Sequence, residues 1–248
     1  MTIYYAVLVL VLGALGGVIV NYLADVLPRT RRFGAPVCRV CEHKYSLKEY
    51  LFSFRCSKCG SRPTMRNFLV VIGMMILSVL AALFPIKGLS YWAVLPVFVF
   101  MVLILTIDME HRVVLNETSI FGAVLMLIAG LFMNGFINTI LGGIAGYGGM
   151  LLLYYFGILF TRFLSKIRHQ EIEEVALGFG DVNVTGFLGL LIGWPDILST
   201  LLIAILLGGL ISLVVILILA ITRKYKAFSA IPYAPFLILA AIFVLFIR

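Results

Sequence analysis

The chain has 248 residues, of which 63% are apolar and 12% are charged. Soluble domains are about half apolar and about a quarter charged, so this composition excludes a soluble globular enzyme, a disordered chain and a small secreted disulfide-stabilised domain. Apolar runs recur along the whole length of the chain. These properties predict an all-α membrane protein with several transmembrane helices.

The uncharged or nearly uncharged runs predict about eight transmembrane helices, because a bilayer requires roughly 20 apolar residues per helix. In chain order these runs cover residues 3–24, 67–84, 91–107, 118–134, 136–161, 182–194, 198–221 and 230–247. The sixth run is short for a membrane core, so we expect it to tilt, to extend past Trp194-Pro195 or to lie partly inside the bundle. Three parts follow: a first transmembrane helix (1–27), a cytoplasmic loop (28–66) and a seven-helix membrane domain (67–248).

The positive charges indicate the orientation. Lys and Arg number ten between Arg29 and Arg66, one at Arg112, three between Arg162 and Arg168, and three between Arg223 and Lys226; only Lys87 and Arg248 fall on the opposite side. By the positive-inside rule the charged loops are cytoplasmic and the N-terminus lies outside. The net charge of +8 is therefore interpreted as an orientation signal and a contact with anionic lipid, not as a nucleic-acid-binding charge.

Small residues in two of the runs predict close packing between helices. The first run contains Gly13, Gly16 and Gly17, and the fifth contains Gly142, Gly143, Gly146, Gly148 and Gly149.

All four cysteines lie in the first cytoplasmic loop, as Cys38-x-x-Cys41 and Cys56-x-x-Cys59. Two such pairs can present four thiolates to one zinc ion at about 2.3 Å, in a structural site with no open coordination position. The alternatives are free thiols or disulfides, and a reducing cytoplasm argues against disulfides. The basic residues around the pairs are interpreted as orientation signals and lipid contacts, with nucleic-acid binding as the less favoured reading: Arg39, Lys44, Lys48, Arg55, Lys58, Arg62 and Arg66.

Two aspartates stand at the edges of apolar runs, where a charge is costly and indicates function. Asp108 ends the third run in Thr106-Ile107-Asp108, and Asp181 follows Gly178-Phe179-Gly180 at the start of the sixth. Both are expected at the cytoplasmic membrane boundary. Two adjacent carboxylates share one proton, so one could activate water while the other donates a hydrogen bond to a peptide carbonyl. The glycines would let an extended substrate backbone approach closely.

The alternative for each aspartate is a helix-end charge that faces water: Asp181 would be an anion at a helix N-terminus, and Asp108 a polar residue that stops the apolar run.

These motifs together resemble the type IV prepilin leader peptidases, over nearly the whole chain. The resemblance is carried by Gly17-x3-Asn21 and Leu27-Pro28, the paired CxxC motifs, Ile107-Asp108 continuing to Asn116, the Gly178 to Asp181 tetrapeptide, and Ile231-Pro232-Tyr233-Ala234-Pro235. It implies that Asp108 and Asp181 are the catalytic pair of an aspartic membrane endopeptidase, with Gly178, Gly180 and Asn116 as supporting motif residues. It also implies a bacterial inner-membrane enzyme that cleaves, on the cytoplasmic side, the basic leader of prepilin or pseudopilin precursors. In many members the new N-terminus is then methylated from S-adenosylmethionine.

The chain departs from the family pattern at three places. Leu115 precedes Asn116 where a proline is usual, and Asn183 follows Val182 where a lysine is usual. These changes suggest an altered pH or substrate preference. The usual Arg-Tyr-Pro-x-x-Glu, whose glutamate is tied to methyl transfer, is replaced by a stretch from Arg66 to Val71 that ends in valine, which argues against methylation.

Two other functions fit the same residues. One is a different GxGD membrane protease that acts on other substrates. The other is a non-catalytic scaffold or transporter, in which the zinc loop binds a partner; a transporter would place polar groups at the bilayer midplane.

Overall fold

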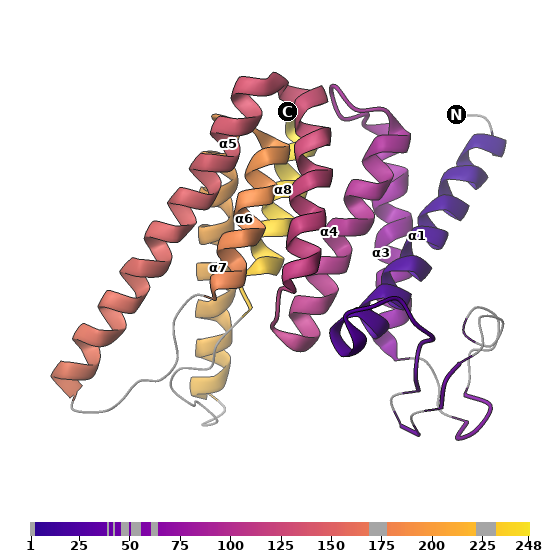
Figure 1. The fold of residues 1–248 in the computed structure, drawn as a ribbon, viewed down its shortest axis with the longest axis horizontal. Helices are drawn as coiled ribbons and strands as arrows, with labels where there is room; N and C mark the ends of the chain where they lie inside the picture. The colour runs from indigo at the N-terminus through magenta and orange to yellow at the C-terminus, as the bar shows by residue number, and fades with distance from the viewer. Residues whose placement is uncertain are drawn as a thin grey trace. The chain divides into compact units, whose positions relative to one another are not determined.

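The computed structural model describes residues 3–38, 40, 41, 43–45, 50, 56–60, 64–168, 178–221 and 232–248. Their helices are α1 (Ile3–Thr30), α3 (Met65–Leu83), α4 (Tyr91–His111), α5 (Asn116–Arg168), α6 (Phe179–Ile192), α7 (Asp196–Ile221) and α8 (Ala234–Ile247), as shown in Figure 1. Within these residues there is no β-strand, only a bridge between Val37 and Lys44. The predicted all-α class is confirmed.

Every predicted apolar run contains a helix, although several boundaries differ. Five helices (α1, α3, α4, α5 and α7) are long and apolar enough to cross a membrane. The shorter α6 and α8 have 14 residues each, about 21 Å of helix. α6 starts at Phe179, before the predicted residue 182, and α8 is described from Ala234 onward. The number of membrane crossings and the external N-terminus stay predictions.

The helix α5 is interrupted at Gly135, between the fourth and fifth predicted runs. Gly135 has φ 74° and ψ 172°, a backbone conformation that is open to glycine and strained for other residues. The segments before and after Gly135 run in opposite directions, so α5 forms a helical hairpin (Figure 1). The predicted division between residues 134 and 136 is therefore correct.

The chain forms two compact units, Met1–His111 (unit 1) and Arg112–Arg248 (unit 2). In unit 1, α1 packs against both α3 and α4. This close packing depends on glycines: a Cβ on Gly13 would lie 2.8 Å from the Met75 Cα, and one on Gly17 would lie 2.6 Å from the Val71 Cα. The small face predicted for the first helix is thus an α1–α3 interface.

In unit 2, α6 is the central helix and contacts α5, α7 and α8. The backbone of α5 approaches α6 where glycines face each other, since a Cβ on Gly142 would collide with the Gly189 carbonyl and one on Gly146 would lie 2.6 Å from the Thr185 carbonyl oxygen. Gly148 has open space around its Cα. The prediction of a packing role is therefore confirmed for Gly142 and Gly146 and wrong for Gly148.

Candidate active site

Asp181 is the third residue of α6 and is 8% exposed. The Gly178 amide donates a hydrogen bond to the Asp181 Oδ2 at 3.3 Å, and the Asp181 amide donates to the Gly178 carbonyl at 3.1 Å. The carboxylate therefore lies at the N-terminal end of the helix, where exposed amides and the helix dipole favour negative charge. Gly178, the first glycine of the tetrapeptide, thus binds Asp181 through its backbone amide and carbonyl.

The second glycine of the tetrapeptide has a steric role. A Cβ on Gly180 would lie 2.9 Å from the Val114 Cγ2, so the segment that precedes Asn116 packs directly on the start of α6. Leu115 is buried, and its carbonyl accepts hydrogen bonds from the Thr118 hydroxyl and the Ser119 amide. The backbone carbonyl of Leu115 thus accepts the first hydrogen bonds of α5.

Tyr233, at the start of α8, interacts electrostatically with Asp181. The Tyr233 ring also faces Gly208 of α7, where an added Cβ would lie 3.0 Å from it. Gly208 lies 13 residues before the end of α7, which is about 20 Å along the helix axis. The Tyr233 side chain therefore lies beside the middle of α7. Ile231, at the start of the motif that contains Tyr233, lies outside the described residues.

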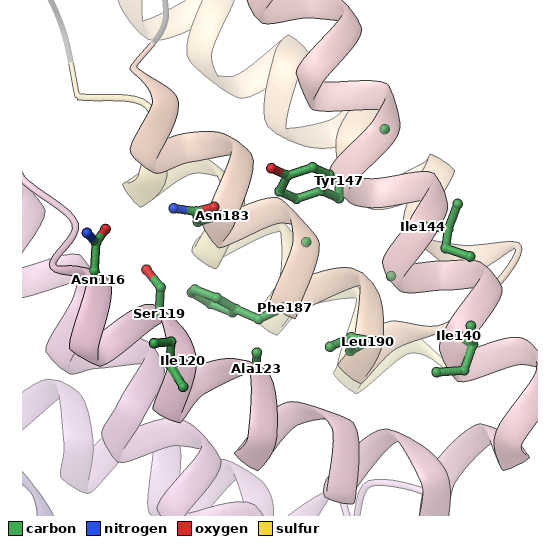
Figure 2. Close-up of a pocket in the computed structure, with 13 residues that line it drawn as sticks. Asn116, Ser119, Ile120, Ala123, Ile140, Ile144, Tyr147, Asn183, Phe187 and Leu190 are labelled. Atoms are coloured by element: carbon green, nitrogen blue, oxygen red, sulfur yellow. The ribbon is translucent and has the colours of Figure 1, made fainter.

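A pocket of about 810 Å³ runs along α6 between the two segments of α5 (Figure 2). Its lining comes from both α5 segments and from α6: Asn116, Ser119, Ile120, Ala123, Ile140, Gly143, Ile144, Tyr147, Gly148, Asn183, Gly186, Phe187 and Leu190. Asn116, Ser119 and Asn183 gather at one end, whereas Ile140 and Leu190 lie at the other (Figure 2). Because Asn183 follows Asp181 by two residues, the polar end is the end nearer to Asp181.

Asp108 lies in the last turn of α4 and is 6% exposed. Thr106, two residues earlier, is also buried, and its hydroxyl donates a hydrogen bond to the Val102 carbonyl within the helix at 2.7 Å. Asp108 belongs to unit 1 and Asp181 to unit 2. The structure thus brings Gly178, Gly180, Asn116 and Asp181 together, and the pairing of Asp181 with Asp108 stays a prediction.

The four cysteines come together as the spacing predicts. Their sulfurs all lie within 4.8 Å of one another, with Cys38 3.6 Å from Cys59 and Cys41 3.6 Å from Cys56. A tetrahedral zinc site with bonds of about 2.3 Å requires sulfurs about 3.8 Å apart, so the donor set fits the ion. All four cysteines are free rather than disulfide-bonded.

Backbone hydrogen bonds hold both cysteine pairs in tight turns. The Cys38 amide donates to the His43 carbonyl, and the Gly60 amide to the Cys56 carbonyl, both at 2.8 Å. A backbone hydrogen bond at His43 lowers the pKa of the Cys41 thiol, but partial burial and the neighbouring thiols outweigh it and raise this pKa to about 12. A bound zinc ion would reverse the balance, because it binds thiolates.

Arg66 has a role that the sequence interpretation missed. Its guanidinium contacts the Asp25 carboxylate at 2.9 Å and the Glu110 carboxylate at 2.8 Å, and its side chain is only 14% exposed. The assignment of Arg66 as a lipid contact is therefore wrong. Its two acidic partners lie 41 and 44 residues away in sequence, so no local pattern identifies them. Arg39, Lys48, Arg55 and Arg62 lie outside the described residues.

Residues 95–213 match the type IV leader peptidase family. The prepilin leader peptidase/N-methyltransferase of Pectobacterium carotovorum subsp. carotovorum is 25% identical over 216 residues, which cover 83% of this chain and 72% of that protein. The protein with the same name from Pseudomonas putida is 25% identical over 215 residues, 83% of this chain and 69% of the relative. No solved structure matches the chain significantly.

Proposed function

We propose that the chain, whose residues 95–213 match the type IV leader peptidase family, is a membrane aspartic endopeptidase that removes the basic leader of prepilin-like precursors. The observation that carries this proposal is the buried Asp181 at the start of α6, the helix that also lines a pocket with one polar and one apolar end. We place the enzyme in the bacterial inner membrane, with its active site open to the cytoplasm.

The proposed reaction is hydrolysis by the pair Asp108 and Asp181. The anionic carboxylate takes a proton from water as the water oxygen bonds to the scissile carbonyl carbon, and the protonated carboxyl donates a hydrogen bond to the developing oxyanion. The carbon–nitrogen bond then breaks, and the proton passes to the leaving amine. Sequence proximity supports the pair, since Asp108 lies six residues before Val114 and Val114 packs on Gly180.

The pocket along α6 matches the two parts of a prepilin substrate. Its apolar end would hold the hydrophobic helix that follows the cleavage site. This substrate helix is already dehydrated, because it lies in the bilayer. At the polar end, the amides of Asn116 and Asn183 each offer donors and an acceptor to an extended backbone near the scissile bond. We therefore propose that Asn183, in place of the usual lysine, contacts substrate backbone rather than a negative charge.

We propose that the cysteine cluster binds a structural zinc ion through Cys38, Cys41, Cys56 and Cys59. Four protein sulfurs complete the tetrahedron, so the ion would stabilise the loop and take no part in hydrolysis. The close approach of the four sulfurs supports this assignment.

Methyl transfer from S-adenosylmethionine is expected to be weak or absent. Val71 stands where the family's methyltransferase-linked glutamate is usual, and its Cα lies against Gly17 at the α1–α3 interface. A carboxylate at this position would have to point out of a tight apolar contact between two helices. We therefore assign the chain to leader cleavage.

Cleavage of a prepilin-type precursor by the purified protein in lipid vesicles tests the proposal. Asp108→Asn and Asp181→Asn should each lower kcat by about a thousandfold or more, because the amide keeps the shape of the side chain and cannot transfer the proton. Asp196→Asn is the matched control, since Asp196 also lies in the first turn of a helix but is paired with Arg248 at 2.9 Å. Near-normal cleavage by either active-site variant would contradict the proposal. If the wild-type protein cleaves no precursor, the result would favour the alternative function of a non-catalytic membrane scaffold.

A further inference from the structure

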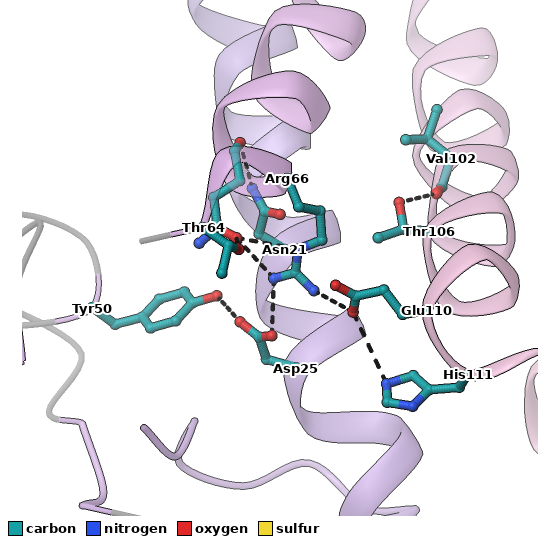
Figure 3. Close-up of polar contacts among 10 residues, drawn as sticks. Asn21, Asp25, Tyr50, Thr64, Arg66, Val102, Thr106, Glu110 and His111 are labelled. Atoms are coloured by element: carbon teal, nitrogen blue, oxygen red, sulfur yellow. Dashed lines mark hydrogen bonds and ion pairs between the residues drawn. The ribbon is translucent and has the colours of Figure 1, made fainter. Parts of the chain in front are cut away.

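A network of charged and polar side chains joins the ends of three helices in unit 1 (Figure 3). Arg66 is its centre: one terminal nitrogen contacts the Asp25 carboxylate of α1 at 2.9 Å, and the other contacts the Glu110 carboxylate of α4 at 2.8 Å. The Arg66 Nε donates to the side-chain oxygen of Asn67 at 3.1 Å. The guanidinium is thus held on three sides. The two carboxylate side chains that bind it are themselves mostly buried, at 13% exposed for Asp25 and 21% for Glu110.

Only arginine can make this arrangement. Its planar fork presents several N–H donors in fixed directions and serves two carboxylates at once, whereas a lysine ammonium is a single point of charge on a flexible stem. In partly buried surroundings such charge-assisted hydrogen bonds hold their partners more firmly than neutral ones. The network therefore fixes the end of α4 relative to α1 and α3.

The same network reaches the cysteine loop. The Tyr50 hydroxyl donates to the second oxygen of the Asp25 carboxylate at 2.8 Å, and the Tyr50 ring packs edge-on against Tyr45 at 5.9 Å between centroids. The Tyr45 amide donates to the Pro36 carbonyl, next to the turn that contains Cys38. A series of contacts thus connects the first cysteine pair to α4.

We propose that Arg66 is a positioning residue for Asp108, holding the last turn of α4 through Glu110 and tying that turn to the cysteine loop through Asp25 and Tyr50. Asp108 and Glu110 share this last turn, so a displacement of Glu110 moves the Asp108 carboxylate. The inference rests on the proposed function, and it gives the cysteine loop a role in the reaction without placing zinc near the substrate.

The test compares cleavage by Arg66→Lys, Glu110→Gln and Tyr50→Phe proteins reconstituted in vesicles. Each should lower kcat while KM stays within about twofold, because a misplaced reacting group costs about 10- to 100-fold in rate without changing substrate contacts elsewhere. Arg29→Lys and Tyr22→Phe are the matched controls and should retain wild-type kcat. Arg29 is exposed in the last turn of α1, and the Tyr22 hydroxyl donates to the Gly34 carbonyl outside the network. Tyr22→Phe keeps the ring that packs edge-on against Tyr50.

Coupling is measured with the double variant Arg66→Lys/Tyr50→Phe. If Tyr50 acts through Arg66, the double variant loses no more kcat than Arg66→Lys alone. Losses in kcat that multiply would overturn the connection to the cysteine loop. If Arg66→Lys does not fold, Glu110→Gln and Tyr50→Phe carry the same test.

Hydrogen–deuterium exchange separates this inference from the proposed function. Backbone amides in the last turn of α4 should exchange about tenfold faster in Arg66→Lys and Glu110→Gln, since local opening becomes easier when its tertiary contacts are removed. This readout applies even to a protein that cleaves no prepilin. Unchanged exchange at residues 108–111, or a KM that rises as much as kcat falls, would overturn the positioning role.

Discussion

The two units hold their carboxylates in different ways. In unit 1, Asp25 and Glu110 are both bound by the guanidinium of Arg66. In unit 2, Asp181 accepts a hydrogen bond from the Gly178 amide and lies where glycines allow close backbone contact. A carboxylate that shares an arginine is held in place by charge-assisted hydrogen bonds, whereas one at a helix start is held by backbone amides. The contrast is between two carboxylates held by an arginine side chain and one held by the backbone of a helix start.

The architecture of the units differs accordingly. The end of unit 1 that carries the cysteine loop is organised by polar groups: the cysteine cluster and the Arg66 network. The centre of unit 2 is organised by steric fit, with α6 pressed against α5 through facing glycines. Unit 1 should therefore lose stability when a cysteine ligand or a charged group of the Arg66 network is removed. Unit 2 should lose stability when a methyl group is added at a facing glycine.

The largest expected effect is on the cysteine cluster. Purified protein should contain about one zinc ion per chain, and Cys56→Ser should lower this below about half an equivalent, because four thiolates are needed to close the tetrahedron. Metal analysis gives the stoichiometry, and hydrogen exchange of residues 36–45 should rise while exchange in α6 stays unchanged. Val40→Ser is the control, since Val40 lies between the first two cysteines and is 73% exposed. Four freely titrating thiols in wild-type protein would refute the zinc assignment.

A smaller effect is expected from one methyl group in unit 2. A Cβ on Gly146 would lie 2.6 Å from the Thr185 carbonyl oxygen and 3.2 Å from the Ile197 side chain. Gly146→Ala should therefore lower the free energy of unfolding by about 1–3 kcal/mol, the usual cost of overpacking, and reduce Tm in detergent. The control is Gly209→Ala, because Gly209 has open space around it and alanine favours a helix. Equal Tm values for both variants would contradict the packing role.

Much of the fold could be predicted from the sequence because hydrophobic length and glycine placement are local signals. The break at Gly135 lies between two predicted runs. Gly13 and Gly146 allow close approach of neighbouring helices, as predicted for small residues. The cysteine spacing also predicted a cluster that the structure forms. Each of these signals lies within a short stretch of sequence, even where the packing partner, as for Gly13 and Gly146, is distant.

Other parts of the site could not be predicted because they depend on depth and on partners distant in sequence. The apolar run begins at residue 182, but α6 starts at Phe179, which makes Asp181 part of the helix. The contact between Tyr233 and Gly208, which places the start of α8 beside the middle of α7, joins residues that no motif connects. Arg66 was one basic residue among many in its loop, and only its contacts reveal its role.

The smallest effect is expected in the pocket of unit 2, where a side chain can be enlarged without disturbing the glycine contacts. Ala123 lines the pocket, whereas its neighbour Val124 is 53% exposed and does not. Ala123→Phe would fill space that the substrate's apolar helix needs, and it should raise KM for a prepilin about 5- to 10-fold while kcat changes little, as expected when uniform binding is lost. Val124→Phe adds a ring of similar size on the exposed side of the same helix and should leave KM unchanged. If both variants raise KM equally, the ring perturbs the bilayer contact rather than the pocket, and the substrate helix lies elsewhere.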